Sequence, residues 1–381
     1  MTTTTVFRVS ARAFVTQSRR PIKIRGIWNN VTDGGGGNPV TIFIPSDESY
    51  MLTSDERSKL ASICPWESVF IEPSAELEKG QASDEIQSVF RFFMPSGEEV
   101  SFCGHAAIGA CAFLANRNII TSYQPNKIQE SFLPTDLPSL DLVSSSSVVS
   151  FITADKSIFE TKVNGNDAEL VMHAQHVETD CFRDKKFRND TATMEDFLDV
   201  LGLSTEDISS LEGSINWPTF INSSVARPKT LIPIKSLDRL HSATSPADPE
   251  KFCQLCESID STGIYIYAKI GDADARGEET KGLSFEARQF PKSSGYGEDP
   301  ATGIAAGALA ASLHKRGITR NDFYDIFQGT AMGKPSRIGV KLQHCQGDSV
   351  QAVDDNKINH VKISYAGLVT FDSFEFSHLS N

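Results

Sequence analysis

The sequence is poor in three features, and each shortage excludes a class of protein. It has no apolar run approaching the roughly 20 residues that a membrane-spanning helix needs. It has no Lys/Arg run suited to phosphates, and its net charge of −13 repels polyanions. Its seven cysteines are an odd, scattered set in 381 residues, which argues against a disulfide framework. We therefore expect no membrane span, no nucleic-acid partner and a reducing compartment.

Common cofactor and metal motifs are also missing. Gly34–Gly37 is not followed by the Gly-Lys-Ser/Thr of a phosphate-binding loop, so a turn leading into a strand is favoured. Cys253 and Cys256 have zinc or redox spacing, but no second pair accompanies them and their segment is typical of an amphipathic helix. His173 and His176 fall in an alternating run, where residues three apart point to opposite faces. No metal site is expected.

The N-terminal segment bears on location. It lacks the continuous apolar stretch of a secretory signal, so a cytoplasmic protein is expected. The segment is rich in Thr, Arg and Ser and has no acidic residue before Asp33, which keeps an organelle-targeting peptide as an alternative. With 39% hydrophobic and 22% charged residues the chain has the composition of a globular protein, and its length suits two domains.

Proline and serine mark a boundary between two halves. The segment 124–147 contains three prolines and ends in a serine run, so we predict one domain over 1–147 and another over 148–381. Both halves carry an Arg-x-Phe strand, a proline, a Gly-bearing turn and a helix of small residues. Helices are expected over 54–63 (capped by Ser54), 106–115, 194–201, 249–258 and 304–313, and strands over 3–15, 38–44, 67–71, 89–93, 148–152, 170–177, 230–234 and 263–269.

The two Ala/Gly-rich helices, 106–114 and 304–313, suit the centre of a domain because small residues allow close packing of the backbone. The first-turn amides of a helix are unpaired and its dipole is positive there, so such an end can hold a carboxylate. The alternative is that both helices are simply core elements. The polar turns GH and EDPATG that precede them favour an anion site.

Five segments in order resemble the phenazine-biosynthesis PhzF family of the diaminopimelate epimerase-like superfamily. They are GNPVTIFI (37–44), WESVF (66–70), RFFMPSGEEVSFCGHAAIGA (91–110), ARQFPKSSGYGEDPATGIAAGAL (287–309) and FQGTAMGKPSRIGV (327–340). The resemblance implies an α/β (α+β) fold of two similar domains. Each is a curved, mostly antiparallel sheet wrapped around a central helix, with the active site between them and a last strand able to cross back to the first domain. It also implies no cofactor or metal, and homodimers are common in the family.

The resemblance further implies that Glu67 moves a proton between substrate carbons, assisted by His105 and Asp299. A proton shuttle needs a carboxyl in a partly apolar cleft, and Trp66 and Phe70 flank Glu67. The start of a helix disfavours an imidazolium, so His105 is expected to act as a neutral acid/base or hydrogen-bond donor. The alternatives are a surface glutamate, a helix-capping histidine and an aspartate that caps the second helix.

Substrate contacts are expected at the helix starts and in the last matching segment. One departure concerns Ile304, which stands where the phenazine enzyme has a serine, so the substrate is expected to differ from the phenazine precursor. The expected contacts are Gly104, Ala106, Gly303, Ile304, Gly329 and Ser336.

The other departure is Cys103, which stands where related epimerases and proline racemases hold one of two catalytic thiols. Asp299 occupies the place of the second thiol, which disfavours a two-thiol racemase. We therefore expect a cofactor-independent isomerase of a small carboxylated, cyclic or unsaturated metabolite, with Glu67 moving the proton. The alternatives are a catalytically silent binding protein of the same fold and a racemase that uses Cys103.

Overall fold

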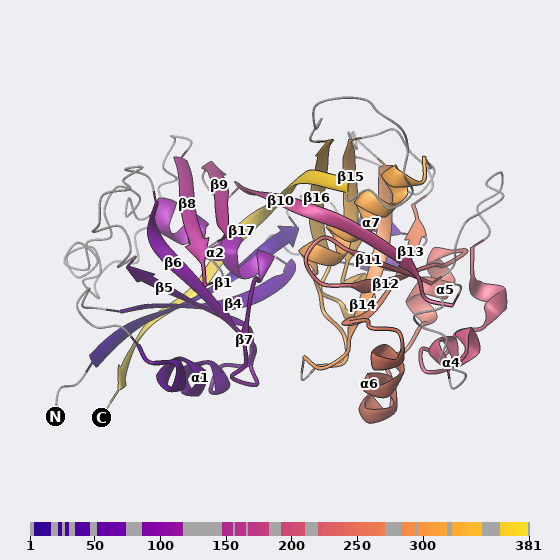
Figure 1. The fold of residues 1–381 in the computed structure, drawn as a ribbon, viewed down its shortest axis with the longest axis horizontal. Helices are drawn as coiled ribbons and strands as arrows, with labels where there is room; N and C mark the ends of the chain where they lie inside the picture. The colour runs from indigo at the N-terminus through magenta and orange to yellow at the C-terminus, as the bar shows by residue number, and fades with distance from the viewer. Residues whose placement is uncertain are drawn as a thin grey trace. The chain divides into compact units, whose positions relative to one another are not determined.

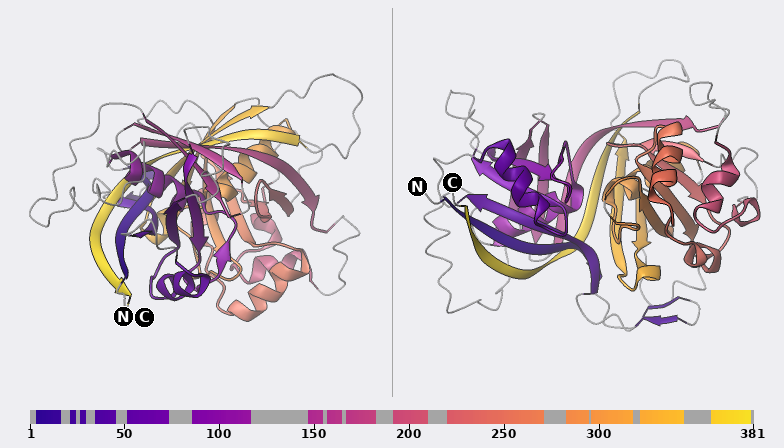
Figure 2. Two further views of the ribbon diagram at one scale, coloured as in Figure 1. Left: turned by 60° about the vertical axis from the view of Figure 1, so that its left-hand side comes forward. Right: turned by 90° about the horizontal axis from the view of Figure 1, so that it is seen from below.

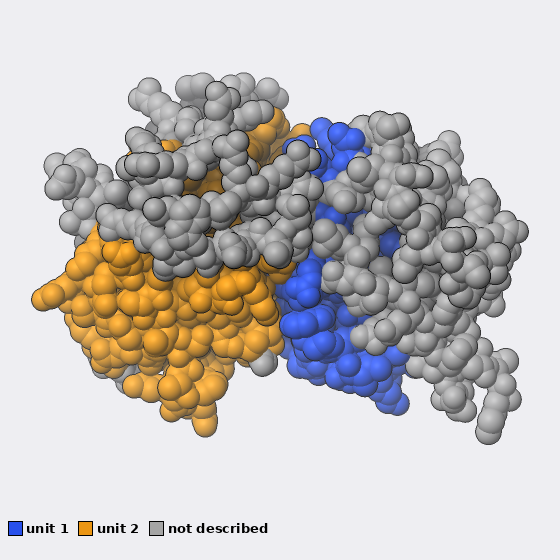
Figure 3. All heavy atoms as spheres, turned by 180° about the vertical axis from the view of Figure 1, so that it is seen from behind, with its two compact units in different colours: residues 1–15, 38–172, 366–381 blue, residues 16–37, 173–365 orange. Residues whose placement is uncertain are grey.

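The chain folds into two compact units, which Figure 3 colours separately on the computed structural model. Unit 1 comprises residues 1–15, 38–172 and 366–381, and unit 2 comprises residues 16–37 and 173–365. The structure describes residues 4–16, 22–24, 27–29, 35–45, 52–73, 86–116, 147–154, 157–164, 167–182, 192–209, 220–270, 283–294, 296–317, 322–344 and 359–379.

Unit 1 is built on a sheet in which antiparallel pairs outnumber parallel ones. Its strands are β1 (Thr4–Thr16), β4 (Gly35–Pro45), β5 (Ser68–Pro73), β6 (Ile86–Phe93), β7 (Glu99–Val100), β8 (Ser147–Thr153), β9 (Ile158–Asn164), the start of β10 (Asp167–Asp180) and the end of β17 (Asn359–Leu379). β4 with β5 and β6 with β8 are parallel. β1 runs antiparallel beside the end of β17, which both views of Figure 2 show.

Helix α2 (Gly104–Asn116) is the central helix of unit 1 and packs against β5, β8 and β9 (Figure 1). Every residue from Ala106 to Ala115 that carries a side chain is nearly inaccessible, as its small-residue sequence predicts. Helix α1 (Ser54–Ser62) covers a different cluster, around Phe43 and Phe70. Its N-cap is Thr53, which forms a capping box with Glu56, so the predicted cap at Ser54 is wrong by one residue.

Unit 2 carries a second sheet of the same kind. Its strands are the rest of β10, then β11 (Ile221–Ser224), β12 (Lys229–Pro233), β13 (Gly263–Lys269), β14 (Leu283–Pro291), β15 (Phe323–Gln328), β16 (Ser336–His344) and the start of β17, with a small hairpin of β2 (Ile22–Ile24) and β3 (Ile27–Asn29). The pairs β12–β13 and β14–β15 are parallel. The pairs β10–β11, β11–β12, β13–β14 and β15–β16 are antiparallel.

Helix α7 (Gly303–Lys315) is the central helix of unit 2, and its first eleven residues are all buried. A methyl group added at Gly307 would lie 2.2 Å from the Tyr365 hydroxyl of β17, so glycine is what permits this close approach. The other face of the sheet packs on α4 (Met194–Asp199), α5 (Leu237–Ser242) and α6 (Pro249–Ser258). Two short 3₁₀ turns, Thr205–Asp207 and Thr330–Met332, also belong to this unit. The fold class expected from the sequence is confirmed in both units.

The division between the units differs from a single boundary after residue 147. β8 and β9 belong to unit 1 because β8 pairs with β6 and β9 pairs with β8. Residues 366–381 also belong to unit 1. Gly35–Gly37, expected as a turn, form the first residues of β4, with positive φ at Gly36 and Gly37.

A buried histidine ties β10 to the central helix of unit 2. His176 is 3% exposed, and its Nε2 lies 3.0 Å from the hydroxyl of Ser223. That hydroxyl donates its proton to the carbonyl of Ala308 in α7 at 3.0 Å, so the imidazole must be the donor to Ser223. Burial lowers the pKa of His176 to about 4, against the opposing charge of Glu178.

We expect this histidine to make unit 2 sensitive to acid. An unfolded histidine titrates near 6.5, so between pH 6.5 and 4 the unfolded chain binds more protons than the folded one. The stability contributed by neutral His176 is therefore complete above pH 6.5 and is lost as the pH falls towards 4. Between pH 7.5 and 4.5, urea unfolding of the wild type should lose about 2.5 kcal/mol more than that of His176→Gln. The exposed His173→Gln is the control; equal losses in wild type and His176→Gln would disprove the assignment.

Candidate active site

Four polar side chains gather in unit 1 where the start of α2 meets β4 and β5. Asn38 lies on β4, Glu67 directly precedes β5, and Cys103 and His105 flank the first residue of α2. All four are buried, with Glu67 and His105 each 6% exposed. Glu67 is held in place by its backbone, because its carbonyl accepts the amide of Thr41 from the parallel strand β4 at 2.9 Å.

The distances indicate which nitrogen of His105 carries the proton. Its Nδ1 lies 3.4 Å from the Asn38 amide nitrogen and 3.4 Å from the Cys103 sulfur. The NH₂ group of Asn38 can only donate, so Nδ1 is its acceptor and Nε2 carries the hydrogen, whereas the Cys103 sulfur can donate or accept. Nε2 lies 3.8 Å from the Glu67 carboxylate. The neutral imidazole therefore presents an N–H towards Glu67, which is the arrangement expected of a general-acid partner.

Phe70 does not line the surroundings of the Glu67 side chain in the way that the sequence indicates. Phe70, named as its neighbour, packs with Phe43 and the residues of α1, with ring centroids 4.7 Å apart in the Phe43 pair. Side chains alternate along a strand, so Glu67 and Phe70 point to opposite faces. At the start of α2 the Glu67 carboxylate lies near His105, and the next residue of the helix, Ala106, is fully buried.

Asp299 lies in unit 2, ahead of α7, and is 7% exposed. Its carboxylate accepts the Thr302 hydroxyl at 2.5 Å and the Ala301 amide at 3.3 Å. The N-cap residue of α7 is Thr302, and no side-chain cap bond is made there. Asp299 thus braces the turn that leads into the helix, and the alternative that it caps α7 is not supported, because the N-cap residue is Thr302.

A glutamine that the sequence did not single out holds this turn. Gln328 ends β15 and is fully buried. Its amide nitrogen donates to the carbonyl of Asp299 at 2.6 Å and to the Thr302 hydroxyl at 3.1 Å. Its amide oxygen accepts the Thr302 amide and the Tyr265 hydroxyl, each at 3.2 Å. The sequence signal for this residue was the Gln-Gly pair in the last matching segment. The hydrogen-bond partners of Gln328 lie too far away in the sequence to be inferred from that pair.

A buried ion pair anchors the other side of the same turn. Glu298 and Arg288 form two parallel bonds of 2.8 and 2.6 Å, and both residues are at most 9% exposed. Arg288 also donates to the carbonyls of Leu240 and His241 near the end of α5. The EDPATG turn is therefore fixed on one side by β14 and on the other by Gln328.

The remaining expected contacts are found at helix starts and in one turn. Gly104 and Gly303 open α2 and α7, and Ala106 and Ile304 follow in their first turns. Ala106 is fully buried and Ile304 is 6% exposed. A methyl group at Gly104 would meet only Phe102 at 3.7 Å, an ordinary contact, so packing alone does not require glycine there.

Gly329 and Ser336 bound the turn between β15 and β16. Gly329 has a φ of +81°, and a methyl group there would lie 2.2 Å from the carbonyl of Lys334, so packing requires a glycine. The Ser336 hydroxyl accepts the Gly37 amide at 2.8 Å and donates to the Lys334 carbonyl at 3.1 Å. Both residues therefore shape the turn.

The two histidines were expected to point to opposite faces of a strand, and their directions are as predicted. His173 is exposed whereas His176 is buried, so the two point to opposite faces of β10. Cys253 and Cys256 lie on α6, with only Cys256 buried. Within the ranges that the structure describes, no three His, Cys, Asp or Glu side chains are grouped to hold a metal ion. None of the helices in those ranges is long and apolar enough to cross a bilayer.

The comparison with family models matches one part of the chain. Residues 229–364, which carry EDPATG and QGTAMG, match the family described as phenazine biosynthesis-like protein. This part of the chain is therefore similar to that family. An uncharacterized isomerase of Clostridium acetobutylicum is 26% identical over 343 residues, covering 88% of this chain and 92% of that protein. The uncharacterized isomerase YfhB of Bacillus subtilis is 22% identical over 344 residues, with the same coverages of 88% and 92%.

Solved structures show the fold of the phenazine biosynthesis-like family over nearly the whole chain. The Bacillus anthracis phenazine biosynthesis protein of the PhzF family superposes with a TM-score of 0.62 at 18% identity, covering 99% of both chains. A hydroxyproline epimerase from Agrobacterium vitis superposes with a TM-score of 0.52 at 12% identity, covering 98% of this chain and 91% of that chain. The fold is thus shared with an epimerase, and both curated relatives are named isomerases.

Proposed function

We propose that the protein isomerises a small carboxylated, cyclic or unsaturated metabolite, without a cofactor, by removing a proton from one carbon and returning it to another through Glu67. The observation that carries this proposal is the buried pair of Glu67 and the N–H-bearing Nε2 of His105, 3.8 Å apart. A buried carboxylate with one neutral donor beside it can accept a proton and then give it back. Asp299 remains the predicted substrate-contacting carboxylate of unit 2.

The proton balance of the proposed reaction is simple. The Glu67 carboxylate takes a carbon-bound proton and becomes the neutral acid, while the electron pair of the broken bond spreads into the unsaturated, carboxyl-bearing part of the substrate. The neutral acid then returns the proton to a second carbon, and Glu67 is ionised again. His105 supports this cycle by donating from Nε2, because a fixed donor beside the carboxylate stabilises its ionised state between turnovers.

Two experiments distinguish this proposal from a silent binding protein. A thermal-shift screen of small carboxylic acids finds ligands, since a ligand at 100 times its dissociation constant stabilises the protein by about 2.7 kcal/mol. Each stabilising acid is then incubated with the protein and analysed for an isomer of equal mass. The proposal requires at least one acid to be converted. Ligands that bind and are all recovered unchanged would support the silent binding protein.

Cys103 distinguishes the shuttle from a racemase. Its sulfur lies 3.4 Å from Nδ1 and 3.8 Å from Nε2 of His105, beside the imidazole that also lies near Glu67. In the proposed mechanism the thiol only helps to orient the imidazole, and a serine hydroxyl can do the same. We expect Cys103→Ser to keep turnover within about threefold of wild type, measured on the converted acid. A loss of two orders of magnitude or more would instead assign proton transfer to the thiol.

A further inference from the structure

A buried lysine in unit 2 has unused hydrogen-bonding capacity. Lys229, the first residue of β12, is 6% exposed, and its ammonium donates to the carbonyl of Thr262 at 3.2 Å. An ammonium carries three donors, and this is its one hydrogen bond within the described part of the chain. Its strand partner Ser223 bonds to α7, and directly opposed side chains share a face of the sheet. Lys229 therefore lies on the face that carries the central helix.

A buried glutamine lies beside it without any partner for its side chain. Gln289 is 1% exposed, and neither atom of its amide has a hydrogen-bond partner among the residues described. It pairs across the strands with Tyr265, whose hydroxyl donates to Gln328 of β15. Gln328 also accepts the amide of Thr302, the N-cap residue of α7, so Gln289 shares the α7 face. Leaving an amide unpaired in the interior costs about 1–3 kcal/mol, so such a group calls for a polar occupant.

Gly263 lets these two side chains approach one another. Thr230 pairs with Ile264, which sets Lys229 opposite Gly263 on the neighbouring strand. A methyl group at Gly263 would lie 2.6 Å from the Gln289 amide nitrogen. The carbonyl that accepts the Lys229 ammonium is that of Thr262, the residue before Gly263. The side-chain nitrogens of Lys229 and Gln289 therefore both lie near Gly263, which has no side chain.

The charge around Lys229 is unbalanced. Burial and, to a lesser extent, the charge of Arg227 lower the pKa of Lys229 to about 7, while Asp299 and Cys256 oppose the shift. Burial raises the pKa of the Cys256 thiol to about 12, so that group is neutral at pH 7. Among the residues that the structure describes, the cations Lys229 and Arg227 are thus accompanied by one carboxylate, that of Asp299. The first turn of α7, where no side chain caps the amides, adds further positive potential.

We propose that Lys229 and Gln289 form a carboxylate-binding subsite beside Asp299. Lys229 supplies the charge, and the Gln289 amide nitrogen supplies a second donor to the other carboxylate oxygen. The inference rests on the proposed function for one point only, that the natural occupant is the carboxylate of the substrate. At position 304 this protein has an apolar isoleucine where the phenazine enzyme has a serine. Polar contacts to the substrate are therefore expected from other residues, and the subsite of Lys229 and Gln289 supplies them.

The wild-type protein tests the subsite through pH. Formate, acetate and benzoate are titrated into the full chain by calorimetry at pH 6 and pH 8, where all three remain ionised. Because the ammonium of the free protein loses its proton between these values, affinity should fall by about tenfold. Benzamide, the neutral counterpart of benzoate, should bind at least tenfold more weakly than benzoate at pH 6. Failure of all three acids to bind, or an affinity independent of pH, would overturn the proposal.

Two variants assign the effect to residues. Lys229→Met should weaken benzoate at least tenfold and abolish its pH dependence, and Gln289→Met should weaken benzoate several-fold while keeping the pH dependence. Lys235→Met, at a lysine of unit 2 that is 47% exposed, is the matched control and should bind as wild type. Wild-type affinity in Lys229→Met would refute the subsite, and wild-type affinity in Gln289→Met would reduce it to the lysine alone.

The subsite and the proposed reaction fail in different ways. Glu67→Gln should retain benzoate binding with its full pH dependence, since Glu67 belongs to unit 1 and the subsite to unit 2. If benzoate binds through Lys229 but no acid is ever converted, the isomerisation proposal fails and the subsite stands. If acids are converted but Lys229→Met binds benzoate normally, the subsite fails and the isomerisation proposal stands.

Discussion

Glu67→Gln is expected to lower the turnover of any converted acid by two orders of magnitude or more. The amide keeps the size and hydrogen-bonding shape of the side chain but cannot take a proton from carbon, and loss of a general base typically costs 10² to 10⁴. Binding should change little, so the loss should appear in kcat and not in KM. The comparison is made by steady-state kinetics on purified variants.

A matched control separates this effect from a change of surface charge. Glu160→Gln, at an exposed glutamate on β9 of the same unit, should keep turnover within about twofold. His105→Gln is expected to be intermediate, because it removes a partner of Glu67 and not the proton acceptor. Turnover of Glu67→Gln within a few-fold of wild type would rule out Glu67 as the proton carrier.

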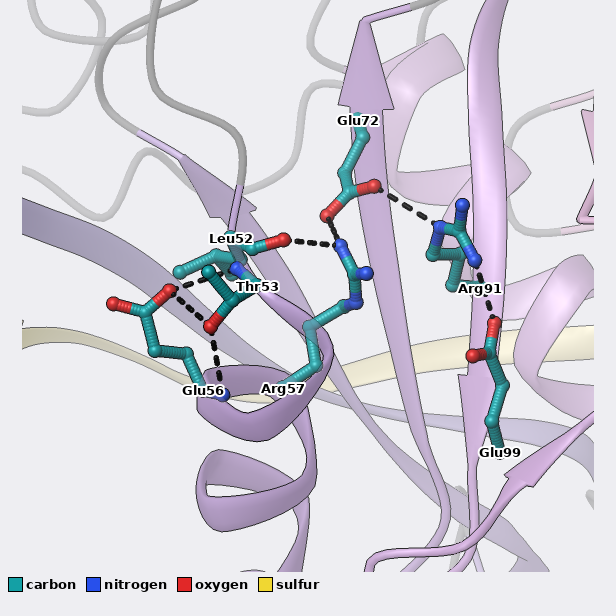
Figure 4. A network of polar contacts seen from close by, with 7 residues as sticks. All are labelled: Leu52, Thr53, Glu56, Arg57, Glu72, Arg91 and Glu99. Atoms are coloured by element: carbon teal, nitrogen blue, oxygen red, sulfur yellow. Dashed lines mark hydrogen bonds and ion pairs between the residues drawn. The ribbon is translucent and has the colours of Figure 1, made fainter.

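The second large effect is on stability and concerns a chain of charges in unit 1 (Figure 4). Arg57 of α1 donates to the carbonyl of Leu52 at 2.6 Å and pairs with Glu72 at 2.5 Å. Glu72 is completely buried at the end of β5, and its other oxygen lies 3.3 Å from Arg91. Arg91 in turn pairs with Glu99 at 2.9 Å. Burial raises the pKa of Glu72, while the two arginines oppose that shift.

Arg57→Met should destabilise unit 1 by about 3–5 kcal/mol, because it removes the closer of the two arginines that pair with the buried Glu72 carboxylate. The measurement is urea unfolding at pH 7. Lys59→Met, at an exposed lysine of the same helix, should cost no more than about 0.5 kcal/mol. Adding Glu72→Met to Arg57→Met should restore part of the loss, since the uncompensated charge is then gone. A loss below 1 kcal/mol for Arg57→Met would show that this network is not a significant source of stability.

The sequence was most informative where the signal is local. Small residues predicted that α2 and α7 are central, and a run of alternating residues placed His173 and His176 on opposite faces of β10. The bounds of α6 and β13 agree with the prediction because their turn signals are adjacent in the chain. The resemblance to a family, not the composition, brought Glu67 and His105 together, and the structure places them 3.8 Å apart.

What the sequence could not predict depends on long-range contacts. Gln328 and the turn at Asp299 are 29 residues apart, and their bond becomes evident only when β15 is paired with β14. The predicted boundary after residue 147 followed a serine run, whereas the pairing of β8 with β6 keeps that strand in unit 1. Lys229 gave no signal at all, because nothing around it in sequence indicates that a lysine is buried there.

The most direct test of the central claim is the fate of a carbon-bound hydrogen. A converted acid is incubated in D₂O with wild type and with Glu67→Gln, and deuterium at carbon is followed by NMR at matched saturation. The account predicts deuterium at the carbon that receives the proton in wild type, and incorporation at least 10² slower in Glu67→Gln while the acid still binds. Equal rates of incorporation in the two proteins would contradict it.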